Sequence, residues 1–370
     1  MASQTNMPIK KDSITIINVA VAVIHYKNQY LLGFRDASQH QGNRYEFVGG
    51  KIEHNEAAKQ ALIREVAEET GMDINSNIAV KLGRLHHDYG DKQVCLQVYR
   101  IEMTALQYEQ YRHCSHGLEG QALSWVDKLK LLAGDYHLPA ANKTILDWLR
   151  LPAQLAITYP LAHFNASPQP MAAWLTYHKE HLAEEAWVYV RIKAAGLEDS
   201  TDSTAQLLHL RPDVQAIVPY HPDSNRANCQ LLKTENSTMN RQIIARHLTH
   251  RQLMQWLSSA EKDKVSNGTI SSSLPLIVSC HNADSIDAAN QLAGARLQQQ
   301  LSPVIAIFLS PVLFTQTHPD VTPLGWEAWS ELAELADMPV IGLGGLSPAM
   351  NEQAMLHGGI AVAGIRQFFK

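Results

Sequence analysis

Three glutamates in the N-terminal third of the chain have a spacing suited to binding a metal ion. Glu65, Glu68 and Glu69 stand at positions i, i+3 and i+4, so in a helix their carboxylates share one face. Clustered carboxylates repel one another unless a cation neutralises them. Hard oxygen ligands on a rigid helix suit Mg²⁺, with Mn²⁺ as a second candidate, because Mg²⁺ keeps waters and bridges to substrate phosphates. Such a metal polarises phosphoryl oxygens and activates water, so the spacing favours hydrolysis at a phosphate group.

These glutamates belong to a longer pattern that begins at Gly50 and ends at Met72. The segment GKIEHNEAAKQALIREVAEETGM fits a glycine, five residues, Glu, seven residues, Arg-Glu, an aliphatic, any residue, Glu-Glu, any residue, a glycine and an aliphatic. An isolated Glu-x-x-Glu-Glu is usually a solvated helix face, but the complete pattern favours a metal site. Arg64 and Glu56 lie about two helical turns apart. Both a structural ion pair and a catalytic role are open for these two residues.

Local signals predict the elements that position this pattern. Glu56–Thr70 is an amphipathic helix, and Gly71 follows where a C-terminal cap belongs. Alternating apolar residues predict a hairpin of two strands, Ile17–Tyr26 and Tyr30–Gly33, around the turn Lys27-Asn28. Further along, a strand is predicted at Val94–Glu102 and a closing helix at Ala141–Leu149.

The rest of the chain alternates short apolar runs with helix-like segments. The eight runs are Leu155–Tyr159, Trp187–Ile192, Ala216–Pro219, Ile243–His247, Leu276–Ser279, Ile305–Leu309, Val340–Leu343 and Ile360–Ala363. The clearest helical segments between them are Asp284–Leu297 and Leu324–Leu335. This order predicts a (β/α)8 barrel. The polar segments His221–Asn240 and Lys262–Ser273 are interpreted as surface insertions or mobile loops.

Composition narrows the classes of function. The 370 residues suggest two domains, which we set at 12–150 and 153–370. The net charge of −5 argues against nucleic acid as a partner and favours small anionic substrates. The four cysteines show no Cys-x-x-Cys spacing, the N-terminus has no apolar signal region, and no apolar stretch is long enough to span a bilayer. We therefore expect a cytoplasmic protein without a membrane contact; the oligomeric state is left open.

The complete Gly50–Met72 pattern is that of the Nudix hydrolases, and residues Ile14–Leu149 resemble the MutT type of that family, the 8-oxo-dGTP diphosphatases. Tyr45–Glu53 resembles the family segment WEFPGGKIE, with Val48 in place of the proline. Glu119-Gly120-Gln121 resembles its EGQ stretch, and Leu138–Asn142 its FPxAN motif. The resemblance implies a Nudix α/β/α sandwich before the barrel. One departure is Phe34, which stands where the family often has the first of two arginines.

The resemblance also implies site residues and a reaction. The metal ligands would be the Gly49 carbonyl, Glu65, Glu68, Glu69 and Glu119, and the four glutamates would be catalytic. Substrate would contact Arg35, Glu46, Phe47 and Asn142. Asn142 would read the purine edge, since an amide both donates and accepts; the alternative is that it caps the helix it opens. Water would attack the β-phosphorus of a nucleoside triphosphate and release a monophosphate and pyrophosphate.

The second half resembles thiamine-phosphate synthases and their thiazole tautomerase relatives. The similarity lies in an R-x-K pair, a strand-end Ser and His, a loop like G-P-V-F-x-T-x-T-K, and an IGGI-like turn. The implied phosphate or thiazole-ligand site comprises Arg191, Lys193, Ser279, His281, Thr315, Thr317, His318, Gly344 and Gly345.

Several departures suggest that the synthase activity is degenerate. His318 stands where the family has a lysine, and Arg251-Gln252 stand where an acid is expected. An Asn-Asp pair expected after the third strand is not evident around Val218–Asp223. The main hypothesis is hydrolysis of 8-oxo-dGTP, which removes it from the nucleotide pool. The alternatives are hydrolysis of thiamine-pathway pyrophosphates, and a barrel that serves as a ligand-binding regulator or scaffold of the hydrolase.

Overall fold

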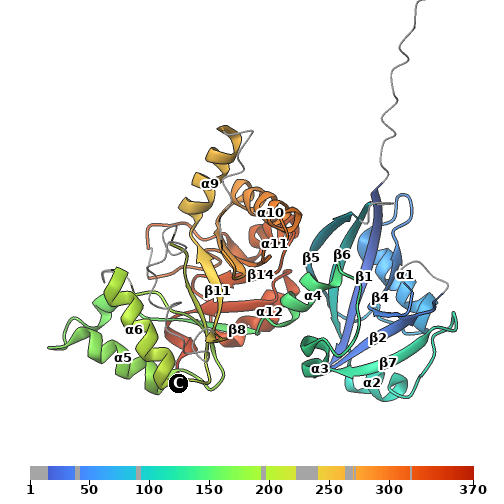
Figure 1. Ribbon diagram of the computed structural model, residues 1–370, viewed down its shortest axis with the longest axis horizontal. Coiled ribbons are helices and arrows are strands. Elements are labelled where there is room, and N and C mark those ends of the chain that lie inside the picture. Colours follow the sequence, from blue (N-terminus) through green and yellow to red (C-terminus); the bar gives the residue numbers. More distant parts are fainter. Residues whose placement is uncertain are drawn as a thin grey trace, which may run out of the picture.

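The computed structural model describes residues 16–37, 42–88, 93–192, 197–221, 241–262, 270, 272–316 and 319–370. Two bodies lie side by side in it, an open sheet built from the first part of the chain and a closed barrel built from the second (Figure 1). Helix α4 lies between them in this view.

The N-terminal sheet has seven strands, with the order β3-β2-β1-β6-β5; β4 pairs with β1 and β7 with β2. The strands are β1 (Ile16–Tyr26), β2 (Gln29–Arg35), β3 (Arg44–Glu46), β4 (Val48–Lys51), β5 (Ala79–Asp88), β6 (Gln93–Glu102) and β7 (Ala122–Asp127). The helices are α1 (Ala58–Thr70), α2 (Ala105–Tyr111), α3 (Lys128–Ala133) and α4 (Asn142–Leu149). The predicted hairpin forms between β1 and β2, which pair antiparallel on either side of Lys27-Asn28.

Alternation along β1 explains why this sheet is covered on both faces. Ala20, Ala22 and Ile24 belong to one buried cluster, which also contains the apolar residues of α1. Val21 and Val23 point the other way and join the cluster that contains α4. Since successive strand residues face opposite sides, α1 and α4 lie on opposite faces of the sheet. The predicted α/β/α sandwich is confirmed.

The second body is a closed barrel of eight parallel strands, in the order β10-β11-β12-β13-β14-β15-β8-β9. Its strands are β8 (Gln154–Ile157), β9 (Trp187–Tyr189), β10 (Gln215–Pro219), β11 (Ile243–Leu248), β12 (Leu276–Cys280), β13 (Val304–Leu309), β14 (Val340–Leu343) and β15 (Ala361–Gly364). Each of the eight apolar runs contains one of these strands or most of one, so the predicted (β/α)8 barrel is confirmed.

Helices follow most barrel strands and cover the outside of the barrel. They are η1 (Leu161–Phe164), α5 (Pro170–His181), α6 (Leu197–Leu210), α9 (His250–Lys262), α10 (Ala283–Gln298), α11 (Gly325–Leu335), η3 (Pro348–Met350), α12 (Asn351–Leu356) and η4 (Arg366–Phe368). The two helices predicted most clearly, Asp284–Leu297 and Leu324–Leu335, correspond to α10 and α11. Of the two predicted insertions, residues 222–240, 263–269 and 271 lie outside the described residues.

Two observations bear on the expectations from composition. Cys95, Cys114 and Cys280 are free thiols, whereas Cys229 lies outside the described residues. Across the described ranges, no helix is long and apolar enough to cross a membrane.

Candidate active site

Helix α1 carries the three glutamates, and its position is determined by packing against the sheet and by a C-terminal glycine cap. Ala61, Leu62 and Val66 are buried against the sheet, which fixes the rotation of the helix about its axis. Gly71 ends it in the left-handed conformation, with φ of 73°, and its N–H donates to the Ala67 carbonyl. Glycine adopts this φ without a steric penalty. The predicted helix and its C-terminal cap are both observed.

Arg64 ties this helix to the loop that precedes it. Its guanidinium donates two hydrogen bonds of 2.9 Å to the Glu56 carboxylate and one of 3.0 Å to the Lys51 carbonyl. It also donates to Glu65 at 2.8 Å and to Glu68 at 3.0 Å. The guanidinium holds the pKa of the Glu56 carboxyl down at about 2. This arrangement supports the structural interpretation of Arg64 and Glu56 as an ion pair that braces the loop.

We expect Arg64→Lys to lower turnover about tenfold, because a lysine ammonium cannot match the forked contacts of a guanidinium with three carboxylates and a carbonyl. The measurement is steady-state hydrolysis of a nucleoside triphosphate at saturating Mg²⁺. Arg112→Lys is the matched control, since Arg112 makes one exposed ion pair of 3.0 Å with Glu109. Wild-type turnover in Arg64→Lys would show that the forked contacts of Arg64 are not needed to position the site.

The glycine pair before the helix leaves room for the carboxylates. A β-carbon at residue 50 would overlap the Glu65 carboxylate, so only glycine lets that side chain lie against the backbone. Gly49 has φ of 149°, and its N–H donates to the Glu69 carboxylate. Both contacts join the Gly49-Gly50 strand to the acidic face of α1. The backbone at Gly49-Gly50 therefore lies close to the glutamates of α1.

A second loop brings Glu119 to the same region. The Leu118 N–H donates to the Glu69 carbonyl at 2.8 Å, and the Gln121 amide donates to the same carbonyl at 3.1 Å. Glu119 lies between these two anchors with an exposed side chain. Its charge is one of those that raise the pKa of Glu69, as expected for a carboxylate nearby.

The electrostatics of this cluster fit a divalent cation. The pKa of Glu69 is raised to about 8, first by burial and then by the charges of Glu46, Glu65 and Glu119. A cation among these carboxylates would remove the repulsion. Within the described ranges, no group of three or more His, Cys, Asp or Glu is already arranged around a common metal position. Arg64 occupies one oxygen each of Glu65 and Glu68 instead.

The residues expected to contact substrate lie beside the acidic cluster. Arg35 and Glu46 pair with each other at 3.2 Å across β2 and β3. Burial raises the pKa of Glu46, although Arg35 acts in the opposite direction. Phe47 is only 4% exposed and belongs to the same core cluster as Val21. Its observed contacts are those of a core residue, so Phe47 as a substrate contact stays a prediction.

Asn142 is the first residue of α4, and the residue as a whole is 7% exposed to solvent. Ala141 is the N-cap, and no side chain caps this helix. The alternative in which Asn142 is the helix cap is therefore wrong. Among the described residues, the Asn142 side-chain amide makes no hydrogen bond, whereas its backbone N–H donates to the Pro139 carbonyl at 2.9 Å. The amide is not fully buried, because the residue keeps a small part of its surface exposed, so a ligand can reach it there.

The segment before Asn142 packs on strand β3. The Tyr45 N–H donates to the His137 carbonyl at 2.9 Å, and the rings of Tyr45 and Tyr136 meet edge to face at 5.2 Å. Strand β3 ends at Glu46, next to Phe47. These contacts join the start of α4 to the strand that carries the other expected substrate contacts.

In the barrel, the described ligand candidates lie at or after the carboxyl ends of strands. A 2.8 Å hydrogen bond joins Ser279 Oγ and His247 Nε2. The His281 Nδ1–H donates to the Ser310 carbonyl at 2.8 Å. Arg191 follows β9, and its N–H donates to the Thr158 hydroxyl at 2.9 Å. Thr315 lies in the loop after β13. Lys193, Thr317 and His318 lie outside the described residues.

Gly344 and Gly345 form the turn after β14. Their φ angles are 101° and 71°, a region that favours glycine. β-carbons at these positions would lie 2.8 Å from Pro311 and from Leu313, respectively. The Leu313 N–H donates to the Gly344 carbonyl at 3.0 Å. The turn is therefore packed closely against the loop that follows β13.

Sequence reasoning did not single out His247 as a site residue. It is 5% exposed, and burial, followed by the charge of Arg191, lowers its pKa to about 3. Its Nε2 contacts Ser279, whereas its Nδ1 is buried without a hydrogen-bond partner among the described residues. The available signal was a polar residue at the end of an apolar run, which alone did not distinguish it from a loop residue.

An open α/β/α sandwich with an acidic helix after a Gly-Gly strand defines a hydrolase of phosphate anhydrides, and the comparisons with known proteins agree. The NUDIX domain family matches residues 19–148. The 8-oxo-dGTP diphosphatase of Escherichia coli (strain K12) is 30% identical over 135 residues, which are 36% of this chain and 96% of that protein. The CTP pyrophosphohydrolase of the same organism is 41% identical over 58 residues, 16% of this chain and 43% of that protein. The chain belongs to the Nudix hydrolase family, whose members generally use divalent metals such as Mg²⁺.

The barrel has relatives of its own. The thiamine monophosphate synthase family matches residues 269–368. A putative thiamine-phosphate synthase 2 from Aquifex aeolicus (strain VF5) is 33% identical over 64 residues, which are 17% of this chain and 34% of that protein. The predicted resemblance of the barrel to this family is confirmed, and the match covers about a third of that relative.

Proposed function

We propose that the N-terminal domain hydrolyses 8-oxo-dGTP to 8-oxo-dGMP and pyrophosphate, and so removes an oxidised nucleotide before a polymerase uses it. The single observation that carries the choice of base is the side-chain amide of Asn142, which starts α4, is largely enclosed by protein and makes no hydrogen bond to another described residue. The 8-oxoguanine edge offers O6 as an acceptor and N7–H as a donor. One amide can pair with both, because it carries one acceptor oxygen and two donor hydrogens. The N7 of unoxidised guanine is an acceptor and would face the amide oxygen without a proton between them.

The acidic cluster is the proposed catalytic centre. Glu65, Glu68, Glu69, Glu119 and the Gly49 carbonyl are the candidate ligands, and a divalent cation held there supplies positive charge to the phosphoryl oxygens. In the proposed reaction a water oxygen bonds to the β-phosphorus, and the bond from that phosphorus to the oxygen bridging the α-phosphorus breaks. The nucleoside monophosphate leaves with the bridging oxygen, and the water oxygen stays in pyrophosphate. A carboxylate of the cluster accepts the water proton.

Asn142→Ala tests the choice of base. We expect the preference for 8-oxo-dGTP over dGTP, measured as the ratio of the two kcat/KM values, to fall about tenfold, because one or two lost hydrogen bonds are worth ~1–3 kcal/mol. Turnover of dGTP should change much less, since the acidic cluster is untouched. Asn28→Ala, in the exposed turn between β1 and β2, is the matched control.

The substrate panel should also contain CTP and thiamine-pathway pyrophosphates. A ratio of 8-oxo-dGTP to dGTP that is unchanged in folded Asn142→Ala would exclude the base-reading role. A wild-type preference for CTP or for a thiamine-pathway pyrophosphate would replace the proposed substrate while leaving the hydrolytic chemistry in place.

We further propose that the barrel retains a site for a phosphate or thiazole-type ligand without the synthase reaction. The buried Nδ1 of His247, which has no partner within the described ranges, supports a polar ligand position at the mouth of the barrel. The backbone N–H groups of the Gly344-Gly345 turn suit a phosphate. Arg191, Ser279 and His281 are the other described candidates for this site.

A further inference from the structure

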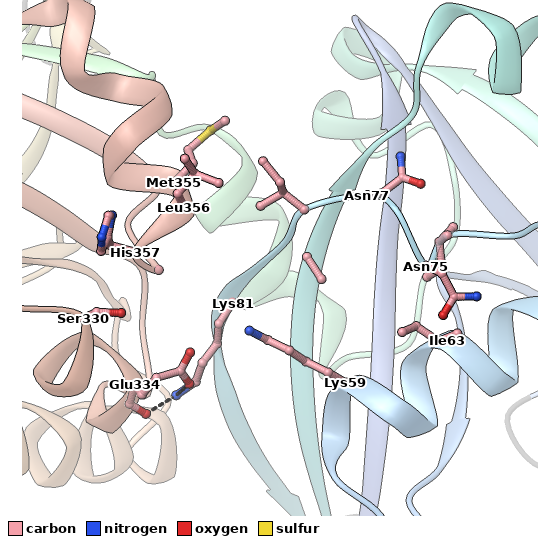
Figure 2. A pocket seen from close by; sticks show the side chains of 14 residues that line it. Lys59, Ile63, Asn75, Asn77, Lys81, Ser330, Glu334, Met355, Leu356 and His357 are labelled. Carbon is pink, nitrogen blue, oxygen red and sulfur yellow. Dashed lines mark hydrogen bonds and ion pairs between the residues drawn. The ribbon is translucent and has the colours of Figure 1, made fainter. Parts of the chain in front are cut away.

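Strand β5, at the edge of the Nudix sheet, contacts the C-terminal end of barrel helix α11. Lys81 of β5 reaches Glu334 in the C-terminal turn of α11 (Figure 2), and Arg84 of the same strand contacts Leu335 and Asp337. The Lys81 ammonium donates to the Glu334 carbonyl, and the Arg84 guanidinium donates to the Leu335 carbonyl at 2.9 Å. The last carbonyls of a helix lack partners within it and carry partial negative charge. Two cations from the other domain therefore satisfy them.

The barrel side of this contact is braced from within. Asn290 of α10 donates to the Leu335 carbonyl at 2.9 Å and accepts from the Asp337 N–H at 2.9 Å. Asp337 in turn accepts from the Arg84 side chain at 2.5 Å, and its carbonyl accepts from the Arg84 N–H at 3.2 Å. The segment that receives β5 is thus part of the rigid frame of the barrel rather than a free loop end.

Gly83 is the point at which three segments meet. The pairing of β5 with β6 shifts register between Lys81 and Gly83, so a bulge turns this part of the strand towards its neighbours. A β-carbon at residue 83 would lie 2.5 Å from the Asp337 carbonyl oxygen and 2.7 Å from the Trp148 ring. Strand β5, helix α4 and the segment after α11 are therefore packed without space for one methyl group.

Helix α4 connects this contact to the proposed base-reading residue. Trp148 is 2% exposed, and α4 also lies against barrel strand β13. Asn142 opens the same short helix, about 9 Å away along its axis at 1.5 Å per residue. Since an α-helix of this length moves as a rigid body, displacement of Trp148 displaces Asn142. The crevice of about 340 Å³ between the domains is lined by Lys59 and Glu334 among others, and Gly83 is not one of its lining residues.

We propose that the barrel is a positioning component of the hydrolase, and that Gly83, Arg84 and Asp337 set the place of Asn142 through Trp148 and α4. This inference rests on the base-reading role of Asn142 proposed above. It assigns to the barrel a function that needs no ligand and no chemistry in the barrel itself. Nucleotide selectivity, rather than turnover, is the property that depends on the domain contact.

The experiment uses the full-length chain and the variants Gly83→Ala, Arg84→Ala and Asp337→Asn. We expect each to lower the ratio of kcat/KM for 8-oxo-dGTP to that for dGTP by about three- to tenfold, in the range of couplings transmitted through packed networks. The kcat for dGTP should stay within about twofold of wild type, because the acidic cluster is untouched. Hydrogen exchange of the α4 amides should accelerate in the same variants.

Two controls separate this effect from a general loss of stability. Gly294→Ala adds a methyl group where no atom lies within 4 Å, and Arg112→Ala removes an exposed ion pair of the Nudix domain. Neither should change the ratio. Asp337→Asn keeps the shape of the side chain, so it reports on the contact if Gly83→Ala does not fold.

The double variant Gly83→Ala/Asn142→Ala tests whether the domain contact affects selectivity through Asn142. If the contact acts through Asn142, adding Gly83→Ala to Asn142→Ala changes the ratio no further. A wild-type chain that prefers 8-oxo-dGTP, with a ratio unchanged in folded Gly83→Ala and Asp337→Asn, overturns the positioning role alone. A wild-type chain without that preference, or an unaffected Asn142→Ala, overturns the substrate proposal and with it the role assigned to the barrel.

Discussion

Glu69→Gln lowers the turnover of a nucleoside triphosphate by at least ~10², because loss of one charged ligand removes several kcal/mol of transition-state stabilisation. Glu69 is the sharpest choice for this substitution. It is half-buried, accepts from the Gly49 N–H and lies among the charges of Glu46, Glu65 and Glu119. Glutamine has the same shape, so the helix and its packing should be retained. Turnover is measured at saturating Mg²⁺.

A stability measurement separates loss of metal binding from loss of fold. The charged form of Glu69 is disfavoured by burial and by its acidic neighbours, so a neutral glutamine should not lower the melting temperature of the EDTA-treated protein. The stabilisation that Mg²⁺ gives the wild-type protein should instead decrease in the variant, because a ligand that binds the native state stabilises it by an amount that falls as Kd rises at a fixed ligand concentration. Glu109→Gln, on the exposed helix α2, is the matched control. Wild-type hydrolysis by Glu69→Gln in Mg²⁺ would show that the metal assignment is wrong.

Glu68→Gln is the second variant of the same series. The Glu68 side chain is 53% exposed and bonds to Arg64 at 3.0 Å. To act as a metal ligand, Glu68 needs a carboxylate oxygen that does not bond to Arg64. Arg64 contacts only Oε2, so Oε1 meets this requirement. We expect the same loss of at least ~10² in turnover. If turnover falls much less in Glu68→Gln than in Glu69→Gln, Glu68 is not a metal ligand and its role is the ion pair with Arg64.

Local sequence signals were sufficient for most of the fold. The eight apolar runs of the barrel were recognisable because parallel strands buried on both faces need continuous apolar residues, as in Val304–Leu309, where all six residues are buried. Helix α1 was recognisable from its apolar period and from Gly71, which ends it. In each case the residues that determine the element lie within it or next to it.

The contact between the domains had no such signal. Lys81 and Arg84 appear in the sequence as ordinary cations of a strand, and their partners Glu334, Leu335 and Asp337 lie about 250 positions later. Pairing of the carbonyls at the end of α11 depends on where the barrel is placed, which local patterns do not specify. The same holds for Gly83, whose lack of a side chain matters only because Asp337 and Trp148 are adjacent.

The candidate site was predicted unevenly for a related reason. The glutamates of α1 follow from helical spacing, and their approach to Gly49-Gly50 is observed. The pairing of Arg35 with Glu46, the burial of Phe47 and the buried ring of His247 depend on neighbouring strands. Sequence patterns identify residue types at a site, whereas burial and pairing between strands decide which of their polar atoms stay available to a ligand.

The full-length chain should not synthesise thiamine phosphate at a measurable rate from hydroxymethylpyrimidine pyrophosphate, thiazole phosphate and Mg²⁺. The reaction must stabilise a leaving pyrophosphate and a developing cation, and the related family does so with a lysine and Mg²⁺-binding acids. His318 replaces that lysine in the sequence, and an imidazole does not carry the permanent charge of a lysine ammonium at physiological pH. Each missing contact costs about 2.7–4 kcal/mol if it resembles a lost oxyanion donor, so together they leave little catalysis.

Gln252, at the position where an acid is expected, gives this prediction its structural basis. Gln252 accepts from the Thr249 N–H at 3.0 Å and from the Thr249 hydroxyl at 2.8 Å, and it donates to the Tyr220 carbonyl at 3.0 Å. Its amide is therefore committed to local hydrogen bonds and offers no charge to a metal.

The assay needs an active thiamine-phosphate synthase as a positive control, and a thermal-shift series with thiazole phosphate and with inorganic phosphate beside it. A melting temperature raised by thiazole phosphate without product formation is the expected combination, because the Gly344-Gly345 turn can bind a phosphate without assisting the loss of pyrophosphate. Robust product formation, or growth of a thiamine-requiring strain that expresses this chain in place of its own synthase, would mean that His318 and Gln252 do not disable the barrel. In that case the chain would join two catalytic activities, and the positioning role of the barrel would accompany a reaction of its own.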